Sequence, residues 1–134
     1  MRPTKVVLDT SAYSQLRVGH PAVVDAVARA SIVYVPTTVL GELEAGFLLG
    51  RRYQENTQAL TEFLSEPFVA ILSVTADVAK RYGKVFMQLR KAGTPVPVND
   101  IWIAATALDA GAHLLTLDRD FDHIVDLEHT VFAV

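Results

Sequence analysis

Short apolar runs alternate along this chain with longer segments in which apolar residues recur at helical spacing. Short runs that are rich in β-branched side chains and end in polar residues or proline predict strands, and the longer amphipathic segments predict helices. We predict strands at 5–9, 32–35, 68–74, 113–117 and 130–134. We predict helices between them at 10–30 with a break near 19–21, and at 37–49, 51–65, 75–91 and 100–110.

Several predicted helices have suitable residues at their ends. Thr37 or Thr38, Thr75 and Asn99 have side-chain oxygens that can accept a hydrogen bond from a first-turn amide. Gly93 suits the left-handed conformation that ends many helices.

The alternation of strands and helices predicts an α/β fold with a mainly parallel sheet and right-handed crossovers. The strands at 5–9 and 113–117 are almost continuously apolar, which indicates that helices cover both faces of the sheet. A chain of 134 residues is the size of one domain, so we expect residues 1–134 to form a single unit.

Four acids lie where predicted strands end or predicted helices begin. Asp9 closes the first strand, and Asp118 follows the fourth. Asp100 opens a helix, and Glu42 lies in the second turn of another. In open parallel sheets, ligands bind outside the carboxyl ends of the strands. If the first and fourth strands are neighbours, the pattern predicts an acidic cleft that binds a divalent cation.

Each acid alone also fits a structural role. Asp9 and Asp100 suit a helix start, and Glu42 suits an exposed helix face. Together, two carboxylates 4 Å apart repel by about 4 kcal/mol at an effective dielectric of 20, and a cation removes that repulsion. Hard carboxylate oxygens select Mg²⁺ or Mn²⁺, which can activate a water and stabilise charge on a phosphate.

The alternating acids Asp118, Asp120 and Asp122 suggest a calcium-binding loop. Such a loop needs Gly at its sixth position and Glu at its twelfth. Counted from Asp118, these positions hold His123 and His129, which excludes the calcium loop and leaves an acid-rich turn.

The net charge of −3 permits a nucleic-acid partner once the proposed site is set aside. Without the four site acids, 15 − 4 = 11 acids remain against 12 bases, a balance of +1. Arg51 and Arg52 at a helix start, and Lys80 and Lys84 on one helix face, are candidate contacts to an RNA backbone. A solvated helix face remains the alternative for the lysines.

Composition excludes several kinds of chemistry. The absence of cysteine excludes disulfides, thiolate zinc sites and cysteine nucleophiles. The chain has no Gly-x-Ser-x-Gly motif, no phosphate-binding glycine-rich loop and no metalloprotease histidine spacing. It also has no apolar segment of membrane-spanning length and no signal-peptide pattern at its start, so we expect a cytoplasmic protein without a membrane partner.

Four sequence segments together resemble the PIN-domain family, and within it the VapC-type toxin ribonucleases. They are Val-Leu-Asp-Thr-Ser at 7–11, Glu-Leu-Glu-Ala-Gly at 42–46, Asn-Asp-Ile-Trp-Ile-Ala-Ala at 99–105 and Leu-Thr-Leu-Asp-Arg-Asp-Phe at 115–121. The segments occur in the family's order, and the resemblance covers nearly the whole chain.

The resemblance implies a three-layer α/β/α sandwich and Mg²⁺- or Mn²⁺-dependent endonucleolytic cleavage of RNA. It implies a homodimer that a cognate antitoxin neutralises. It also implies site residues: a catalytic, metal-binding quartet, supporting hydroxyls, and a neighbouring acid that can share or replace the role of the last quartet member. In this order they are Asp9, Glu42, Asp100 and Asp118; Thr116 and Ser11; and Asp120.

Two other kinds of function stay open. An aspartic acid at the end of the first strand also suits an aspartyl-phosphate phosphotransfer or phosphatase domain, although a phosphatase of that kind wants a second acid where Ser11 stands. A catalytically inactive PIN-like RNA-binding module would keep the same acids without turnover.

The metal hypothesis predicts the effect of removing single carboxylates. Asp9→Asn or Asp100→Asn should abolish Mn²⁺-dependent RNA cleavage and leave the fold intact, because each change removes a charged ligand at constant shape. Cleavage of an RNA pool measures activity, and circular dichroism measures folding. Retained activity in both variants would contradict the assignment.

Overall fold

The computed structural model describes residues 4–134, and the predicted alternation of strands and helices is confirmed there. The strands are β1 (Lys5–Leu8), β2 (Ile32–Pro36), β3 (Val69–Leu72), β4 (His113–Thr116) and β5 (His129–Val131). The helices are α1 (Thr10–Arg17), α2 (Pro21–Arg29), α3 (Thr37–Leu49), α4 (Tyr53–Leu64), α5 (Ala76–Ala92), α6 (Val98–Ala110) and the short 3₁₀ helix η1 (Arg119–His123). The expectation about a signal peptide falls partly on residues 1–3, outside the described residues.

The strands form one sheet in the order β3-β2-β1-β4-β5, and every pairing in it is parallel. β1 lies at the centre, with Val7 opposite Tyr34 of β2 on one side and Leu114 of β4 on the other. The predicted parallel sheet is therefore confirmed, and β1 and β4 are neighbours. The direction of strand progression reverses beside β1, which is where open parallel sheets bind ligands.

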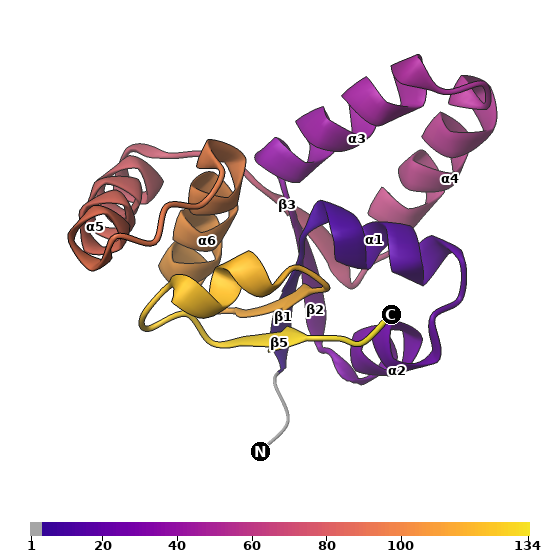
Figure 1. Ribbon diagram of the computed structural model, residues 1–134. Helices are drawn as coiled ribbons and strands as arrows, with labels where there is room; N and C mark the ends of the chain where they lie inside the picture. The colour runs from indigo at the N-terminus through magenta and orange to yellow at the C-terminus, as the bar shows by residue number, and fades with distance from the viewer. Residues whose placement is uncertain (1–3) are drawn as a thin grey trace.

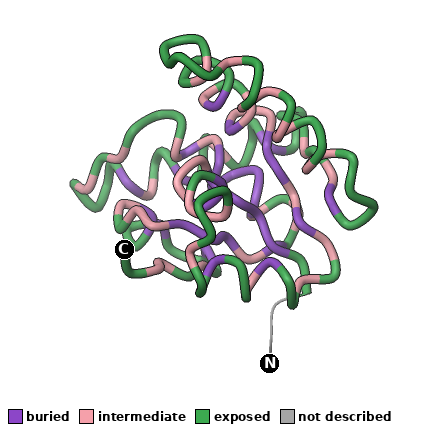
Figure 2. The backbone as a smooth tube through the Cα atoms, turned by 90° about the vertical axis from the view of Figure 1, so that its right-hand side faces the viewer, coloured by how far each residue is buried: buried purple, intermediate pink, exposed green. Residues whose placement is uncertain are grey.

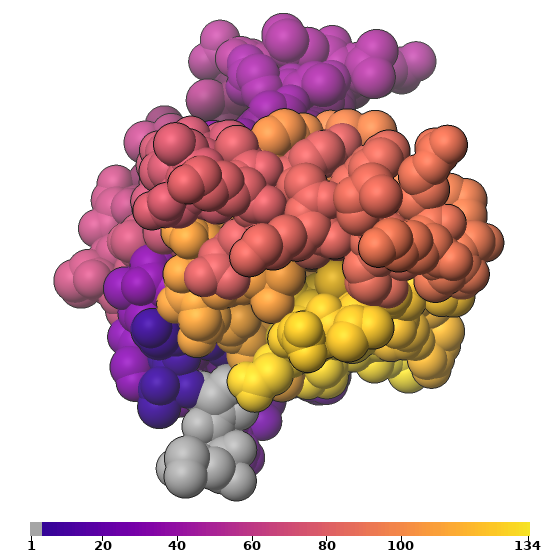
Figure 3. Space-filling model, turned by 90° about the vertical axis from the view of Figure 1, so that its left-hand side faces the viewer, coloured from indigo at the N-terminus to yellow at the C-terminus, as the bar shows by residue number. Residues whose placement is uncertain are grey.

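Helices cover both faces of the sheet in a three-layer α/β/α arrangement. The connections β1 to β2 and β2 to β3 move one way across the sheet, and the connection β3 to β4 returns the other way. Right-handed crossovers then send the two sets of helices to opposite faces. Figure 1 shows α5 and α6 on one side and α1, α2 and α4 on the other. Figure 3 shows α5 spread over its face, with α3 standing above the body of the molecule.

The core is built on the two central strands. Val6, Val7 and Leu8 of β1 and Leu114 of β4 are fully buried, as expected for strands with helices on both faces. Figure 2 shows these buried stretches running through the centre of the chain path, with exposed segments around them. Phe121 of η1 is also fully buried and anchors the segment after β4 to this core.

Two of the predicted helix caps are wrong. α3 follows Pro36 and α6 follows Pro97, and neither of these helices has a side-chain cap. Proline presets the backbone angle that a helix start needs, so a polar cap is not required. Asn99 therefore lies inside the first turn of α6, and its side chain is free for another contact. The Thr75 cap of α5 is confirmed, since its hydroxyl accepts from the amide of Val78.

Among residues 4–134, no helix has the length and apolar character needed to cross a lipid bilayer.

Replacing Gly83 in α5 and Gly93 at the end of α5 by alanine should change the free energy of unfolding in opposite directions. Gly93 has φ 70° at the end of α5, where alanine is strained, so Gly93→Ala should lower the free energy of unfolding by about 1 kcal/mol. Gly83 lies inside α5 with open space around it, so Gly83→Ala should raise it by about 0.5–1 kcal/mol. Urea unfolding measures both, and changes of the same sign would contradict this account.

Candidate active site

The predicted acids lie around the carboxyl edge of the central strands. Asp9 directly follows β1, and Asp118 follows β4 after one intervening residue. Asp100 lies in the first turn of α6, and Glu42 lies in the second turn of α3. Pairing of β1 with β4 brings the ends of these strands together, which fulfils the condition on which the predicted acidic cleft depends.

Asp9 is the most buried of these acids, with 4% of its surface exposed. One carboxylate oxygen accepts from the amide of Ala12 and from the hydroxyl of Ser11, both at 2.8 Å. The other oxygen accepts from the hydroxyl of Thr116. Asp9 therefore caps α1 and also faces the neighbouring strand end, so the structural and the chemical roles weighed for it coexist.

The supporting hydroxyls predicted at Ser11 and Thr116 each form two contacts. Ser11 donates to Asp9 and accepts from the amide of Leu117 at 3.0 Å. Thr116 donates to Asp9 and accepts from the amide of Asp118 at 2.9 Å. These hydroxyls fix the segment after β4 against the end of β1.

Three carboxylates form the tightest cluster in the described part of the chain. Asp100, Asp118 and Asp120 each offer an oxygen, and these oxygens lie within 4.8 Å of one another. Asp118 accepts from the amide of Asp120 at 2.9 Å, which orients both acids at the start of η1. Asp120, which the sequence offered as a substitute for Asp118, thus lies beside it in the cluster.

Two acids of this site, Asp100 and Asp9, have raised pKa values. Burial, together with the charges of Asp118 and Glu42, raises the pKa of Asp100 to about 7. Burial also raises the pKa of Asp9, against hydrogen bonds that favour its charged form. Among residues 4–134, no ion pair involves any acid of this site. Crowded carboxylates without a basic partner, with hard oxygen ligands, fit a divalent cation.

Glu42 lies beside this cluster, and two residues that the sequence analysis did not assign to the site hold it. Thr10 donates to one Glu42 oxygen at 2.5 Å, and Asn99 donates to the other at 3.3 Å. The sequence pattern predicts Asn99 as a helix cap, and it gives Thr10 no role beyond its place in the segment Val-Leu-Asp-Thr-Ser at 7–11. The available signal was position: each is the chain neighbour of a site acid.

The candidate RNA contacts lie away from the acids along their helices. Arg51 and Arg52 are exposed in the turn between α3 and α4, and Lys80 and Lys84 are exposed on α5. Arg81 of α5 pairs with Asp109 in the last turn of α6. The part of α5 around Arg81, which includes Lys80 and Lys84, therefore faces the end of α6 opposite to Asp100. Asp109 lies nine positions after Asp100 in the helix, which corresponds to about 14 Å along its axis. These four assignments stay predictions.

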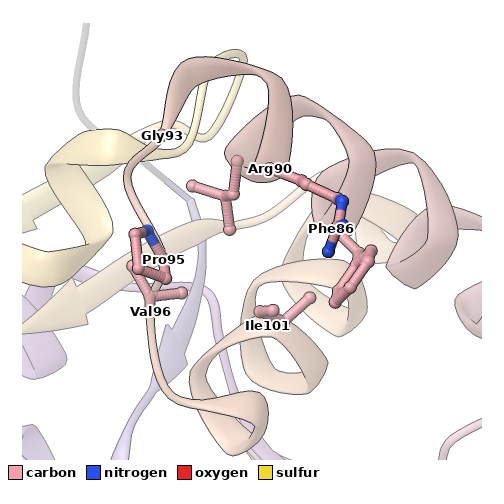
Figure 4. Close-up of a pocket in the computed structure, with 7 residues that line it drawn as sticks. Phe86, Arg90, Gly93, Pro95, Val96 and Ile101 are labelled. Carbon is pink, nitrogen blue, oxygen red and sulfur yellow. The ribbon is translucent and has the colours of Figure 1, made fainter.

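An apolar pocket of about 290 Å³ lies at the other end of the α5–α6 pair. Figure 4 shows Phe86, Arg90 and Ile101 directed into it, with Pro95 and Val96 on the loop that closes one side. This loop leads into the first turn of α6, so the pocket and the acids lie near the same helix end. The pocket contains no carboxylate and is separate from the acidic site.

Comparisons with known proteins agree with this geometry. The PIN domain matches residues 6–127. Ribonuclease VapC4 of Mycobacterium tuberculosis is 32% identical over 94 residues, which cover 70% of this chain and 72% of that protein. Ribonuclease VapC5 of the same organism is 29% identical and covers 89% of this chain and 87% of that protein.

Solved structures show the same fold. VapBC-1 from nontypeable Haemophilus influenzae aligns with a TM-score of 0.83 and 26% identity, over 94% of this chain and 96% of that one. VapBC2 from Rickettsia felis, bound to a DNA fragment from its promoter, aligns with a TM-score of 0.86 and 23% identity, over 96% of this chain and 99% of that one.

A PIN-like α/β/α sandwich with acids at the carboxyl edge of its sheet defines a metal-dependent nuclease class. The chain belongs to the PIN-domain family, and within it to the VapC-type ribonucleases. The fold and the family expected from the sequence are both confirmed.

The raised pKa of Asp100 predicts how pH changes the stability of the metal-free protein. The folded state holds this proton up to a pH of about 7, whereas the unfolded chain loses it near the usual value of 3.8. The contribution to stability is therefore complete at low pH and is lost as the pH rises through about 7. Asp100→Asn should remove this contribution.

The measurement is the difference in melting temperature between Asp100→Asn and the unaltered protein in EDTA. The difference should grow in favour of the variant between about pH 4 and pH 7, over the range set by the two pKa values. Two parallel curves across this range would contradict the placement of Asp100 among buried acids.

Proposed function

We propose that this ribonuclease uses Mg²⁺ or Mn²⁺ at the acidic site to hydrolyse RNA phosphodiester bonds, as the toxin of a toxin–antitoxin pair. The observation that supports this most strongly is the convergence of Asp100, Asp118 and Asp120 within 4.8 Å, with Asp9 and Glu42 beside them. Among residues 4–134 none of these acids forms an ion pair. We assign metal binding to Asp9, Asp100 and Asp118, with Asp120 as a further ligand. We assign Glu42 the catalytic role of orienting the attacking water rather than the metal-binding role that the family resemblance also implies.

The bound cation would neutralise the crowded carboxylates, activate a water and stabilise charge on the scissile phosphate. Asp100 and Asp118 face each other from α6 and from the segment after β4, so they would hold it between two separate elements. Asp9 is fixed by three hydrogen bonds and supplies a carboxylate that cannot swing away. Glu42 stands outside the tight cluster and would orient the attacking water.

The proposed substrate is RNA, because the relatives VapC4 and VapC5 are named ribonucleases. Arg51, Arg52, Lys80 and Lys84 are exposed cations that can contact the phosphate backbone on either side of the site. Their distance from the acids suits positions several nucleotides from the bond that is cleaved.

The proposed protein partners are an antitoxin and a second copy of this chain. The similar structures from Haemophilus influenzae and Rickettsia felis are named VapBC, and a further similar structure from Mycobacterium tuberculosis is described as a member of the VapBC family of toxin–antitoxin systems. Exposed apolar side chains on this chain, including Leu48, Leu49 and Val18, provide surface of the kind that protein partners cover. We place the protein in the cytoplasm, where RNA and a newly made antitoxin are both present, and we keep residues 1–134 as one domain.

An aspartyl-phosphate role for Asp9 is disfavoured. A phosphate acceptor needs an accessible carboxylate oxygen, whereas Asp9 is 4% exposed and both of its oxygens accept hydrogen bonds. No observation favours the inactive RNA-binding module over an active nuclease.

Mapping of RNA ends in cells tests the proposal. Expression of the unaltered protein should produce new 5′ ends at matched positions in one or a few RNAs, and Asp9→Asn should produce none of them. Asp25→Asn makes the same chemical change in α2, where Asp25 pairs with Arg29 of the same helix, so it serves as the matched control and should keep the pattern. Identical ends with the Asp9→Asn variant, or no ends with the unaltered protein at equal expression, would contradict the proposal.

A further inference from the structure

Both carboxylate oxygens of Glu42 accept a hydrogen bond from a neutral side chain. Thr10 Oγ1 donates to Oε1 at 2.5 Å, and Asn99 Nδ2 donates to Oε2 at 3.3 Å. Thr10 is the first residue of α1, Asn99 lies in the first turn of α6, and Glu42 belongs to α3. Three helices thus meet in one side-chain bridge, Thr10–Glu42–Asn99.

The chain positions of the two donors connect this bridge to the other acids. Thr10 directly follows Asp9, and Asn99 directly precedes Asp100. The backbone segments that fix these two acids therefore also fix the donors to Glu42. The carboxylate of Glu42 is placed relative to Asp9 and Asp100, although it comes from a different crossover of the sheet.

The bridge counteracts a repulsion. Glu42 has a like charge close enough to raise the pKa of Asp100, and Asp118 and Asp9 add to that field. A half-buried glutamate on a helix has rotamers that point to solvent, and repulsion favours them. Two neutral donors hold the charged carboxylate without cancelling its charge, which an arginine or lysine would do.

We propose that Thr10 and Asn99 are positioning residues that hold the Glu42 carboxylate against the acid cluster during RNA cleavage. The inference rests on the proposed function, since Glu42 acts there as the group that orients the attacking water. Thr10 and Asn99 act through Glu42, and among residues 4–134 neither side chain forms a hydrogen bond to Asp100, Asp118 or Asp120. Their removal should lower the rate of cleavage more than it changes metal affinity.

Thr10→Val tests the bridge because it removes the hydroxyl and keeps the shape. It should lower kcat about tenfold, the size expected for losing one hydrogen bond to a charged group. The dissociation constant for Mn²⁺, measured by calorimetry without RNA, should stay within about twofold, because the cluster ligands are unchanged. Thr10→Ser keeps the donor and should restore kcat. Asn99→Asp, which replaces the donor by a like charge, should also lower kcat.

A double-mutant cycle separates positioning from general damage. In a Glu42→Gln background, Thr10→Val should cause no further loss of kcat, because the group through which it acts is already altered. Thr61→Val is the matched control, since Thr61 donates to the backbone oxygen of Thr57 in α4 and should leave kcat unchanged.

The outcomes distinguish the bridge from the proposed function. If the Thr10→Val variant cleaves RNA at the unaltered rate, the bridge alone is overturned. The same holds if Thr10→Val lowers kcat equally with and without Glu42→Gln. The bridge is also overturned if Thr10→Val lowers the melting temperature enough to explain the lower kcat and Thr10→Ser does not restore kcat. Unaltered protein that binds no Mn²⁺ and cleaves no RNA would overturn both.

Discussion

Mutual repulsion among carboxylates is the constraint on which this site depends. Asp9, Glu42, Asp100, Asp118 and Asp120 gather at one edge of the sheet, and among the described residues no ion pair relieves them. The fold opposes the repulsion in two ways. Pairing of β1 with β4 sets two of the acids beside each other, and neutral donors hold the oxygens of Asp9 and Glu42. The result is a cluster of carboxylates with no basic partner among the described residues, which is the property that attracts a divalent cation.

Most of the architecture was predictable because it follows from local patterns. The apolar runs at β1 and β4 could only be buried strands, and the helices between them required parallel pairing. The acids at the ends of β1 and β4 share an edge because these two strands are neighbours, and that adjacency is a finding of the structure. The starts of α3 and α6 differ from the prediction. Polar side chains were expected to cap these helices, whereas Pro36 and Pro97 precede them and fix the backbone angle there.

The finer structure of the site was harder to predict, because it depends on side-chain directions that a sequence pattern does not contain. Thr116 and Ser11 were expected as supporting groups, and their hydrogen bonds to Asp9 were found. The prediction of Asn99 as a helix cap is wrong, because α6 starts two residues earlier than predicted and Asn99 lies in its first turn, where the side chain donates to Glu42. The choice between Asp118 and Asp120 was left open, and the geometry places both in the same cluster.

The central position of β1 has a consequence for the assembly of the site. β1 pairs with β4 through segments that lie far apart in the chain, since Asp9 and Thr116 are 107 positions apart, and Asp118 and Asp120 follow β4. Closing so long a loop is entropically costly and slow compared with forming local helices. We therefore expect the acids to come together late in folding, after most of the helices have formed.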